Sequence, residues 1–126
     1  MAKYRIMIVD DSRVIYAEMK RMLDGSDFEI AAYCKNGEEA LEQYEQAAPD
    51  LVTMDIVMPG MDGLETCEEL KKKWPEANIF MVSSMAYEDI IDQAVALGAK
   101  GFLFKPFTKE TLLEGLYGAL KCAGSK

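Results

Sequence analysis

The chain has 126 residues, half of them hydrophobic, which suits one globular domain with its own core. Its formal net charge of -8 argues against the basic face that nucleic acid binding requires, and the absence of histidine excludes histidine-based catalysis and metal binding. Its three cysteines form no Cys-x-x-Cys pair, no segment resembles a signal peptide, and no apolar run is long enough to span a membrane. We therefore expect a cytoplasmic protein with free thiols.

The first part of the chain alternates apolar runs with amphipathic segments. Tyr4–Val9 is apolar apart from one arginine and predicts a buried strand, which is followed by a helix. Residues 28–33 predict a second, more polar strand. Asn36 and Glu39 then indicate a capping pair at the start of the second helix.

The second part of the chain continues the same alternation. Residues 51–54 predict a short central strand, and residues 79–82 and 102–104 predict two more. A helix follows each of these strands, the fourth over about residues 87–97 and the fifth capped by Thr108. Two glycines in the fifth helix are expected to weaken it by about 1 kcal/mol each.

Five strands alternating with five helices predict an α/β fold with a five-stranded, doubly wound parallel sheet and helices on both of its faces. The second strand is the most polar, so we expect it at an edge of the sheet. That placement agrees with the strand order 2-1-3-4-5 of flavodoxin-like folds.

Four of the five apolar runs end at a polar residue that can do chemistry. In a parallel sheet these ends share one edge, where the ligand crevice of open α/β folds lies. The residues expected to meet there are Asp10, Asp11, Asp55, Ser83 and Lys105.

Clustered carboxylates disfavour one another's ionised form unless a cation is present, and hard oxygen ligands suit Mg²⁺. Lysine and serine could then hold phosphoryl oxygens, and a carboxylate can accept a phosphoryl group as an aspartyl phosphate. Taken singly, each residue has a simpler explanation: Asp11 as a helix cap, Ser83 as a loop residue, and Lys105 as a solvated lysine. Their coincidence at one sheet edge favours a site.

Together these residues resemble the pattern of the response-regulator receiver domain over essentially the whole chain. The matching segments are Asp10-Asp11, the acceptor loop from Met54 to Gly63 with Asp55, the Ser/Thr switch position Ser83, the aromatic switch position Phe102, and Lys105-Pro106. Serine at 83 and phenylalanine at 102 replace the commoner threonine and the tyrosine frequent in CheY-like members.

The resemblance implies that Asp55 accepts a phosphoryl group from a sensor histidine kinase with Mg²⁺ as the cofactor. The metal ligands would be Asp10, Asp11, Asp55 and the backbone carbonyl of Val57. Ser83 and Phe102 would then move inward and change the face formed by the fourth helix, fifth strand and fifth helix, where a downstream partner protein binds. The Lys105-Pro106 bond is expected to be cis.

The resemblance also implies that side chains at positions 57 and 85 tune the lifetime of the phosphorylated state. Here Val57 and Met85 are both apolar, and neither can orient an attacking water, so we expect slow self-dephosphorylation.

The resemblance suggests a single receiver domain over residues 1–126 with no output domain, of the stand-alone CheY-like type, acting as a signalling switch and not as an enzyme. A receiver excised from a longer regulator remains an alternative. A phosphatase of the haloacid dehalogenase type also uses an aspartyl nucleophile, but it needs a second aspartate where Val57 lies. A pseudo-receiver that is never phosphorylated usually lacks an acid or the lysine, and this chain has both.

Overall fold

The computed structural model describes residues 3–84 and 87–124, and within these ranges five strands alternate with five helices. The strands are β1 (Tyr4–Val9), β2 (Phe28–Cys34), β3 (Leu51–Asp55), β4 (Ile79–Ser83) and β5 (Gly101–Phe104). The helices are α1 (Arg13–Leu23), α2 (Gly37–Ala47), α3 (Gly63–Lys73), α4 (Glu88–Ala96) and α5 (Lys109–Gly124). All the predicted elements are present, with boundaries shifted by one or two residues. None of the helices in these ranges combines the length and hydrophobicity that crossing a bilayer requires.

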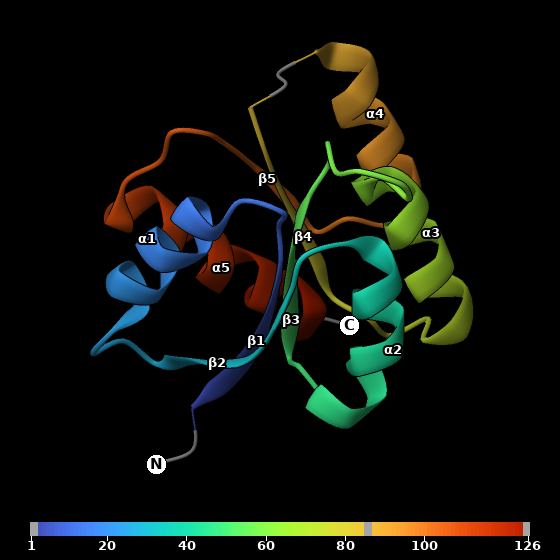
Figure 1. The fold of residues 1–126 in the computed structure, drawn as a ribbon. Helices are drawn as coiled ribbons and strands as arrows, with labels where there is room; N and C mark the ends of the chain where they lie inside the picture. Colours follow the sequence, from blue (N-terminus) through green and yellow to red (C-terminus); the bar gives the residue numbers. More distant parts are fainter. Residues whose placement is uncertain (1–2, 85–86, 125–126) are drawn as a thin grey trace.

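The strands form one parallel sheet in the order β2-β1-β3-β4-β5, as predicted (Figure 1). The polar strand β2 lies at one edge, and the short strand β5 lies at the other. The strand β3 is central, and all five of its residues are buried. The residue at its carboxyl end, Asp55, is buried and pairs with Val82 of β4.

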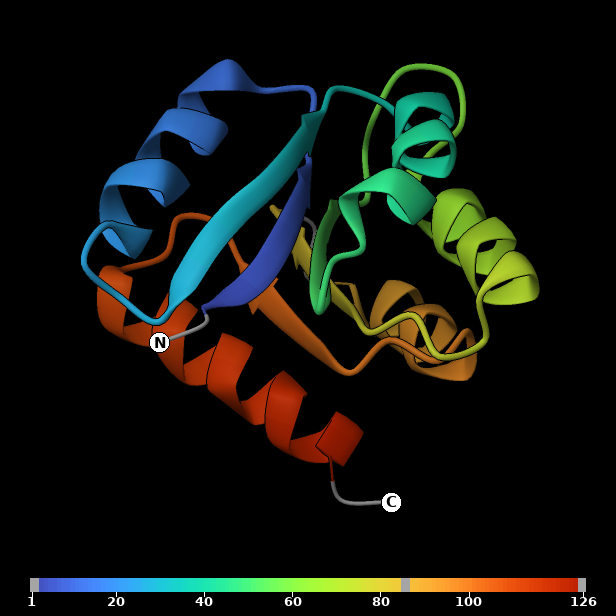
Figure 2. The ribbon, with the colours of Figure 1, turned by 90° about the horizontal axis from the view of Figure 1, so that it is seen from below.

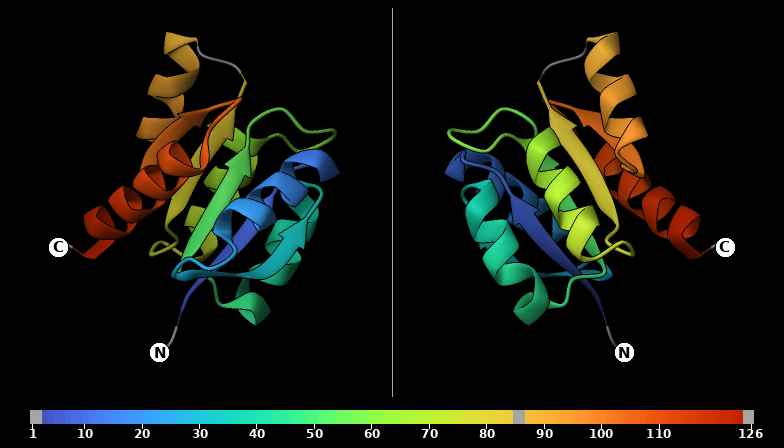
Figure 3. Two further views of the ribbon diagram at one scale, coloured as in Figure 1. Left: turned by 90° about the vertical axis from the view of Figure 1, so that its left-hand side faces the viewer. Right: turned by 90° about the vertical axis from the view of Figure 1, so that its right-hand side faces the viewer.

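Helices cover both faces of the sheet, with α1 and α5 on one face and α2, α3 and α4 on the other (Figures 2 and 3). Alternate strand residues point to opposite faces, so each strand contributes to two core clusters. Met7 and Val9 pack under α2 and α3, whereas Ile6 and Ile8 pack under α1 and α5.

Side-chain hydrogen bonds cap the N-termini of most of the helices. Asn36 Oδ1 accepts a hydrogen bond from the Glu39 amide at 2.8 Å, which confirms half of the expected capping pair. The other half is different, because the Glu39 carboxylate accepts from the Lys35 amide at 2.8 Å and not from that of Asn36. Thr108 Oγ1 accepts from the Thr111 amide at 3.1 Å and caps α5 as predicted.

Gly115 would weaken α5 in isolation, but the packing of this helix against the sheet requires a glycine at this position. A Cβ at Gly115 would lie 2.6 Å from the ring of Phe80, whose side chain is buried under this helix. A Cβ at Gly101 would meet the same ring at 2.6 Å. Both glycines therefore make room for one aromatic side chain between α5, β4 and β5.

Candidate functional site

Strand register brings the predicted polar residues to one edge of the sheet. Val9 pairs with Met54, so Asp10 follows β1 beside the end of β3, where Asp55 is the last residue. Ser83 ends β4 and pairs with Phe104, the last residue of β5. Lys105 follows Phe104, and its backbone amide donates to the Ser83 carbonyl at 2.9 Å. Residues far apart in the sequence thus meet because parallel strands end at the same edge.

Three carboxylates and one ammonium group form the centre of this site. Asp10, Asp11 and Asp55 each offer an oxygen within 4.8 Å of the others. Lys105 Nζ lies 2.9 Å from Asp10 Oδ2 and 3.3 Å from Asp55 Oδ1. Asp10 and Asp55 are buried, whereas Asp11 is exposed at the rim. The site is therefore an acidic pocket with a lysine bridging its two buried acids.

Local backbone contacts hold Asp10 in place. Its Oδ1 accepts a hydrogen bond from the Ser12 amide at 2.9 Å, and its own amide donates to the Cys34 carbonyl at 3.0 Å. Ser12 in turn caps α1 by accepting from the Ile15 amide at 3.3 Å. The turn after β1 therefore fixes one carboxylate of the pocket and starts the first helix.

The surroundings of Asp55 raise the pKa of its carboxyl group. Burial, together with the negative charge of Asp10, raises this pKa from 3.8 to about 6, although Lys105 acts in the opposite direction. Burial would lower the pKa of Lys105, but its hydrogen bond to Asp10 and the charges of Asp10 and Asp55 outweigh burial and raise it. Near neutral pH both groups are charged, and the ionised form of Asp55 is held at a free-energy cost.

The donor set fits Mg²⁺. This ion takes oxygen ligands at about 2.0–2.1 Å in an octahedron, so opposite ligands lie about 4.2 Å apart. Three carboxylate oxygens within 4.8 Å of one another lie slightly wider than this, so small side-chain movements would bring them to one ion. A cation would also relieve the repulsion that raises the pKa of Asp55.

The sequence pattern placed Gly63 only at the end of the acceptor loop and did not predict its close contact with the site. Its amide donates to the Ile56 carbonyl at 2.7 Å. A Cβ at this position would collide with the Asp55 carbonyl oxygen and lie 2.6 Å from the Ile56 Cα. Glycine is needed because α3 begins directly against the backbone of the acceptor strand. The Asp62-Gly63 pair at the end of the loop was the only signal of this contact.

The remaining predicted residues differ in how deeply they are buried. Ser83 is fully buried, and Phe102 is half-buried with its ring centroid 5.2 Å from that of Phe104. The Val57 side chain is 56% exposed, so it points away from the core. Met85 lies outside the described residues. The Lys105-Pro106 bond is cis, which confirms that prediction.

The thiols of the two buried cysteines, Cys34 and Cys67, are not reactive groups of this site. Burial raises the pKa of Cys34 to about 12 and that of Cys67 to about 11. Both thiols are free. They stay protonated near neutral pH and behave as small apolar core residues.

Comparison with known proteins agrees with this geometry. A sequence model of the response regulator receiver domain matches residues 6–117. The chain is 40% identical to the chemotaxis protein CheY of Listeria monocytogenes over 117 residues, which cover 93% of this chain and 98% of that protein. It is 41% identical to the CheY of Bacillus subtilis over 113 residues, which cover 90% of this chain and 94% of that protein.

Two solved structures illustrate the shared fold. The response regulator domain of Thermotoga maritima CheB has a TM-score of 0.86 and 32% identity, covering 94% of this chain and 97% of that chain. A chain of the CheX–CheY–BeF3–Mg²⁺ complex from Borrelia burgdorferi has a TM-score of 0.85 and 29% identity, covering 88% and 84%. With most of its length matched by the family model and by CheY relatives at about 40% identity, this chain belongs to the response regulator receiver family.

Proposed function

We propose that this chain is the phosphoacceptor switch of a two-component system, in which Asp55 receives a phosphoryl group from the phosphohistidine of a sensor histidine kinase. The observation that carries the proposal is the position of Asp55. It is a buried carboxylate at the end of the central strand, 3.3 Å from the Lys105 ammonium and grouped with two further acids. A carboxylate in such surroundings is a suitable nucleophile toward phosphorus.

In the transfer, an Asp55 carboxylate oxygen attacks phosphorus as the phosphorus–nitrogen bond breaks, and the electrons of that bond stay on the imidazole. The attacking group must be ionised, which a pKa of about 6 allows at neutral pH. Lys105 contacts Asp55 Oδ1 and is placed to donate to an incoming phosphoryl oxygen. The hydroxyl of Ser83, at the end of the neighbouring strand, is the second proposed donor.

The carboxylates of Asp10, Asp11 and Asp55, with the backbone carbonyl of Val57, are the proposed holders of Mg²⁺. When bound, the ion supplies positive charge against the phosphoryl oxygens. Mg²⁺ is part of the related B. burgdorferi complex, which supports this assignment. Lys105 pairs with Asp10 at 2.9 Å in the present structure, so its ammonium already neutralises part of the pocket.

We further propose that phosphorylation alters the surface formed by α4, β5 and α5 through Ser83 and Phe102, and that a separate partner protein reads this change. The CheY relatives match this chain over nearly their whole length, which supports a receiver domain that acts by binding. Their likeness favours a switch over an enzyme. An aspartyl phosphatase would need a general acid where the apolar Val57 stands.

Phosphorylation by acetyl phosphate tests the proposal, with intact-protein mass spectrometry as the readout. Wild type should gain the mass of one phosphoryl group in the presence of Mg²⁺ and little after treatment with EDTA. Asp55→Asn should gain none, whereas Asp92→Asn, which removes an exposed carboxylate on α4, should behave as wild type. Full phosphorylation of Asp55→Asn would contradict the assignment.

A further inference from the structure

A groove runs between α3 and α4, on a side of α4 that the proposed switch does not use. Its volume is about 380 Å³, which lies in the range of ligand-binding clefts, roughly 300–1,000 Å³. Figures 1 and 3 show α4 standing beside α3. The apolar part of its lining comes from Leu64 on α3 and from Ala96 and Leu97 at the end of α4.

The apolar lining is incompletely covered by the protein itself. Leu64 and Leu97 are half-buried, Ala96 is exposed, and Ala94 is the one residue of α4 that is buried. Part of the apolar surface between α3 and α4 is therefore exposed to solvent. Ala96 also follows Gln93, another lining residue, at helical spacing, so the two share one stripe.

The rim of the groove is acidic. Asp62, Glu65 and Glu68 line it from the α3 side, and all three are exposed. The part of α4 that lines the groove adds no charge, because its lining residues are Gln93, Ala96 and Leu97.

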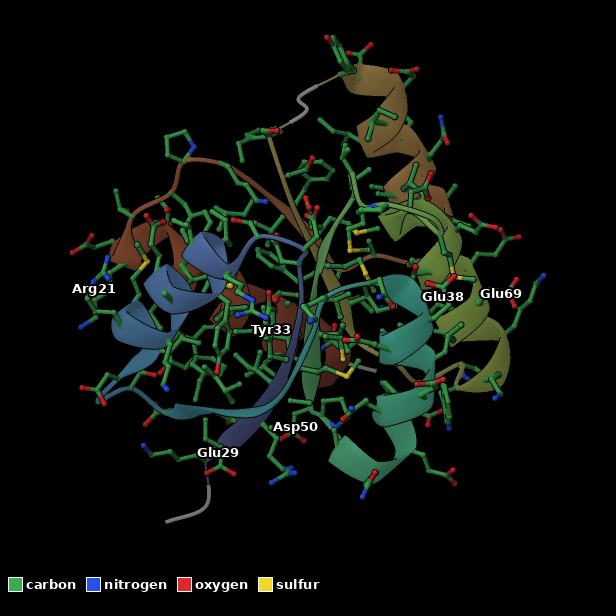
Figure 4. The ribbon with its side chains drawn as sticks, in the orientation of Figure 1. Arg21, Glu29, Tyr33, Glu38, Asp50 and Glu69 are labelled. Carbon is green, nitrogen blue, oxygen red and sulfur yellow. The ribbon has the colours of Figure 1, made fainter. Side chains whose placement is uncertain are left out.

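Two lysines of α3 offset part of this rim, and the Lys71 ammonium lies beside Gly98, the residue after Leu97. Lys72 lies 3.9 Å from Glu68 and 3.6 Å from Glu69, at the far end of α3. Glu69 itself lies on the outer side of the helix (Figure 4). The groove thus combines an apolar floor with an excess of carboxylates along one wall.

We propose that this groove binds a basic amphipathic helix of a partner protein. Apolar side chains at i, i+3, i+4 and i+7 would enter between α3 and α4, and lysines or arginines beside them would face Glu65 and Glu68. An acidic segment, or a second copy of this chain with its charge of -8, would be repelled. The groove is distinct from the α4-β5-α5 surface, because Ile91 and Val95 face the other side of α4.

A synthetic helical peptide of leucine and lysine, about four turns or 14 residues long, is a suitable probe. Leucines occupy the i, i+3, i+4 and i+7 positions, and a scrambled peptide of the same composition is the control. Fluorescence anisotropy of the labelled peptide gives the dissociation constant. Amide chemical shifts of the labelled protein locate the bound peptide.

The amphipathic peptide should bind, with the largest amide shifts on α3 and α4 along the groove. The double variant Glu65→Gln/Glu68→Gln should bind it about fivefold more weakly, as expected for the loss of two partly screened charges. The matched variant Glu42→Gln/Glu45→Gln removes two exposed carboxylates at the same spacing on α2 and should leave the dissociation constant nearly unchanged.

If both double variants weakened peptide binding equally, or if the scrambled peptide bound equally well, the interaction would be a nonspecific electrostatic attraction. Either result would overturn the proposal. The largest shifts on another surface, or no binding of the amphipathic peptide, would overturn it as well. Thermal unfolding of each variant verifies that the exposed substitutions leave the fold intact.

Discussion

Replacing Asp55 with asparagine should stabilise the metal-free protein at neutral pH, because it removes a charge that the folded state holds at a cost. The pKa of Asp55 rises from 3.8 to about 6 on folding, chiefly through burial. Each tenfold change in acid strength corresponds to about 1.4 kcal/mol, which makes the ionised group unfavourable by up to about 3 kcal/mol. Screening by solvent at the open side of the pocket reduces this figure, so about 1–3 kcal/mol is expected.

The sign of this effect depends on pH. Because the folded-state pKa is raised, the folded protein binds the proton more tightly than the unfolded chain does. This residue therefore makes folding progressively less favourable as the pH rises from 3.8 to about 6. The advantage of Asp55→Asn should be complete above that range and should disappear below pH 3.8, where the carboxyl is protonated in both states.

Thermal and urea unfolding of Mg²⁺-free protein at several pH values measures this advantage. For a chain of this length, 1 kcal/mol corresponds to about 4 °C in Tm, so the variant should melt about 4–12 °C higher near neutral pH. Asp92→Asn, on the exposed side of α4, is the matched control and should show no such gain. A variant no more stable than wild type at neutral pH, or a difference independent of pH, would refute the reasoning.

Three other outcomes are expected. Mg²⁺ at ten times its dissociation constant should stabilise wild type by about 1.4 kcal/mol, and a melting temperature that Mg²⁺ leaves unchanged would count against the metal site. Gly63→Ala should destabilise the fold by about 2 kcal/mol or more in urea unfolding, because its Cβ would meet the backbone of Asp55 and Ile56; near wild-type stability would mean that α3 can shift freely. Val57→Asn with Met85→Glu should shorten the lifetime of the phosphorylated form, followed after removal of the donor, and an unchanged decay rate would exclude a role for these positions.

The sequence was sufficient to predict the sheet and the residues at its edge. Strand alternation and the polarity of β2 led to the observed strand order. Since parallel strands end at one edge, the position of Asp10, Asp55 and Lys105 directly after apolar runs implied that they meet. This step needed no knowledge of side-chain geometry.

What could not be predicted depends on the packing of segments distant in sequence. The pattern did not reveal that Lys105 lies nearer to Asp10 than to Asp55, at 2.9 Å against 3.3 Å. The sequence predicted only that Gly115 and Gly118 weaken α5, whereas Gly115 makes room for the Phe80 ring and Gly118 has open space beside it. Such contacts depend on how closely two elements approach, which periodicity does not specify.

The central claim is that Asp55 carries the phosphoryl group, and chemical trapping of the phosphorylated protein tests it most directly. Borohydride reduces an acyl phosphate but leaves a free carboxylate intact, so a phosphorylated aspartate becomes homoserine. After treatment with acetyl phosphate and Mg²⁺, peptide mapping by tandem mass spectrometry should find homoserine at position 55 and at no other aspartate. Homoserine at Asp10 or Asp11, or an unmodified Asp55 in protein that has gained a phosphoryl group, would contradict the account.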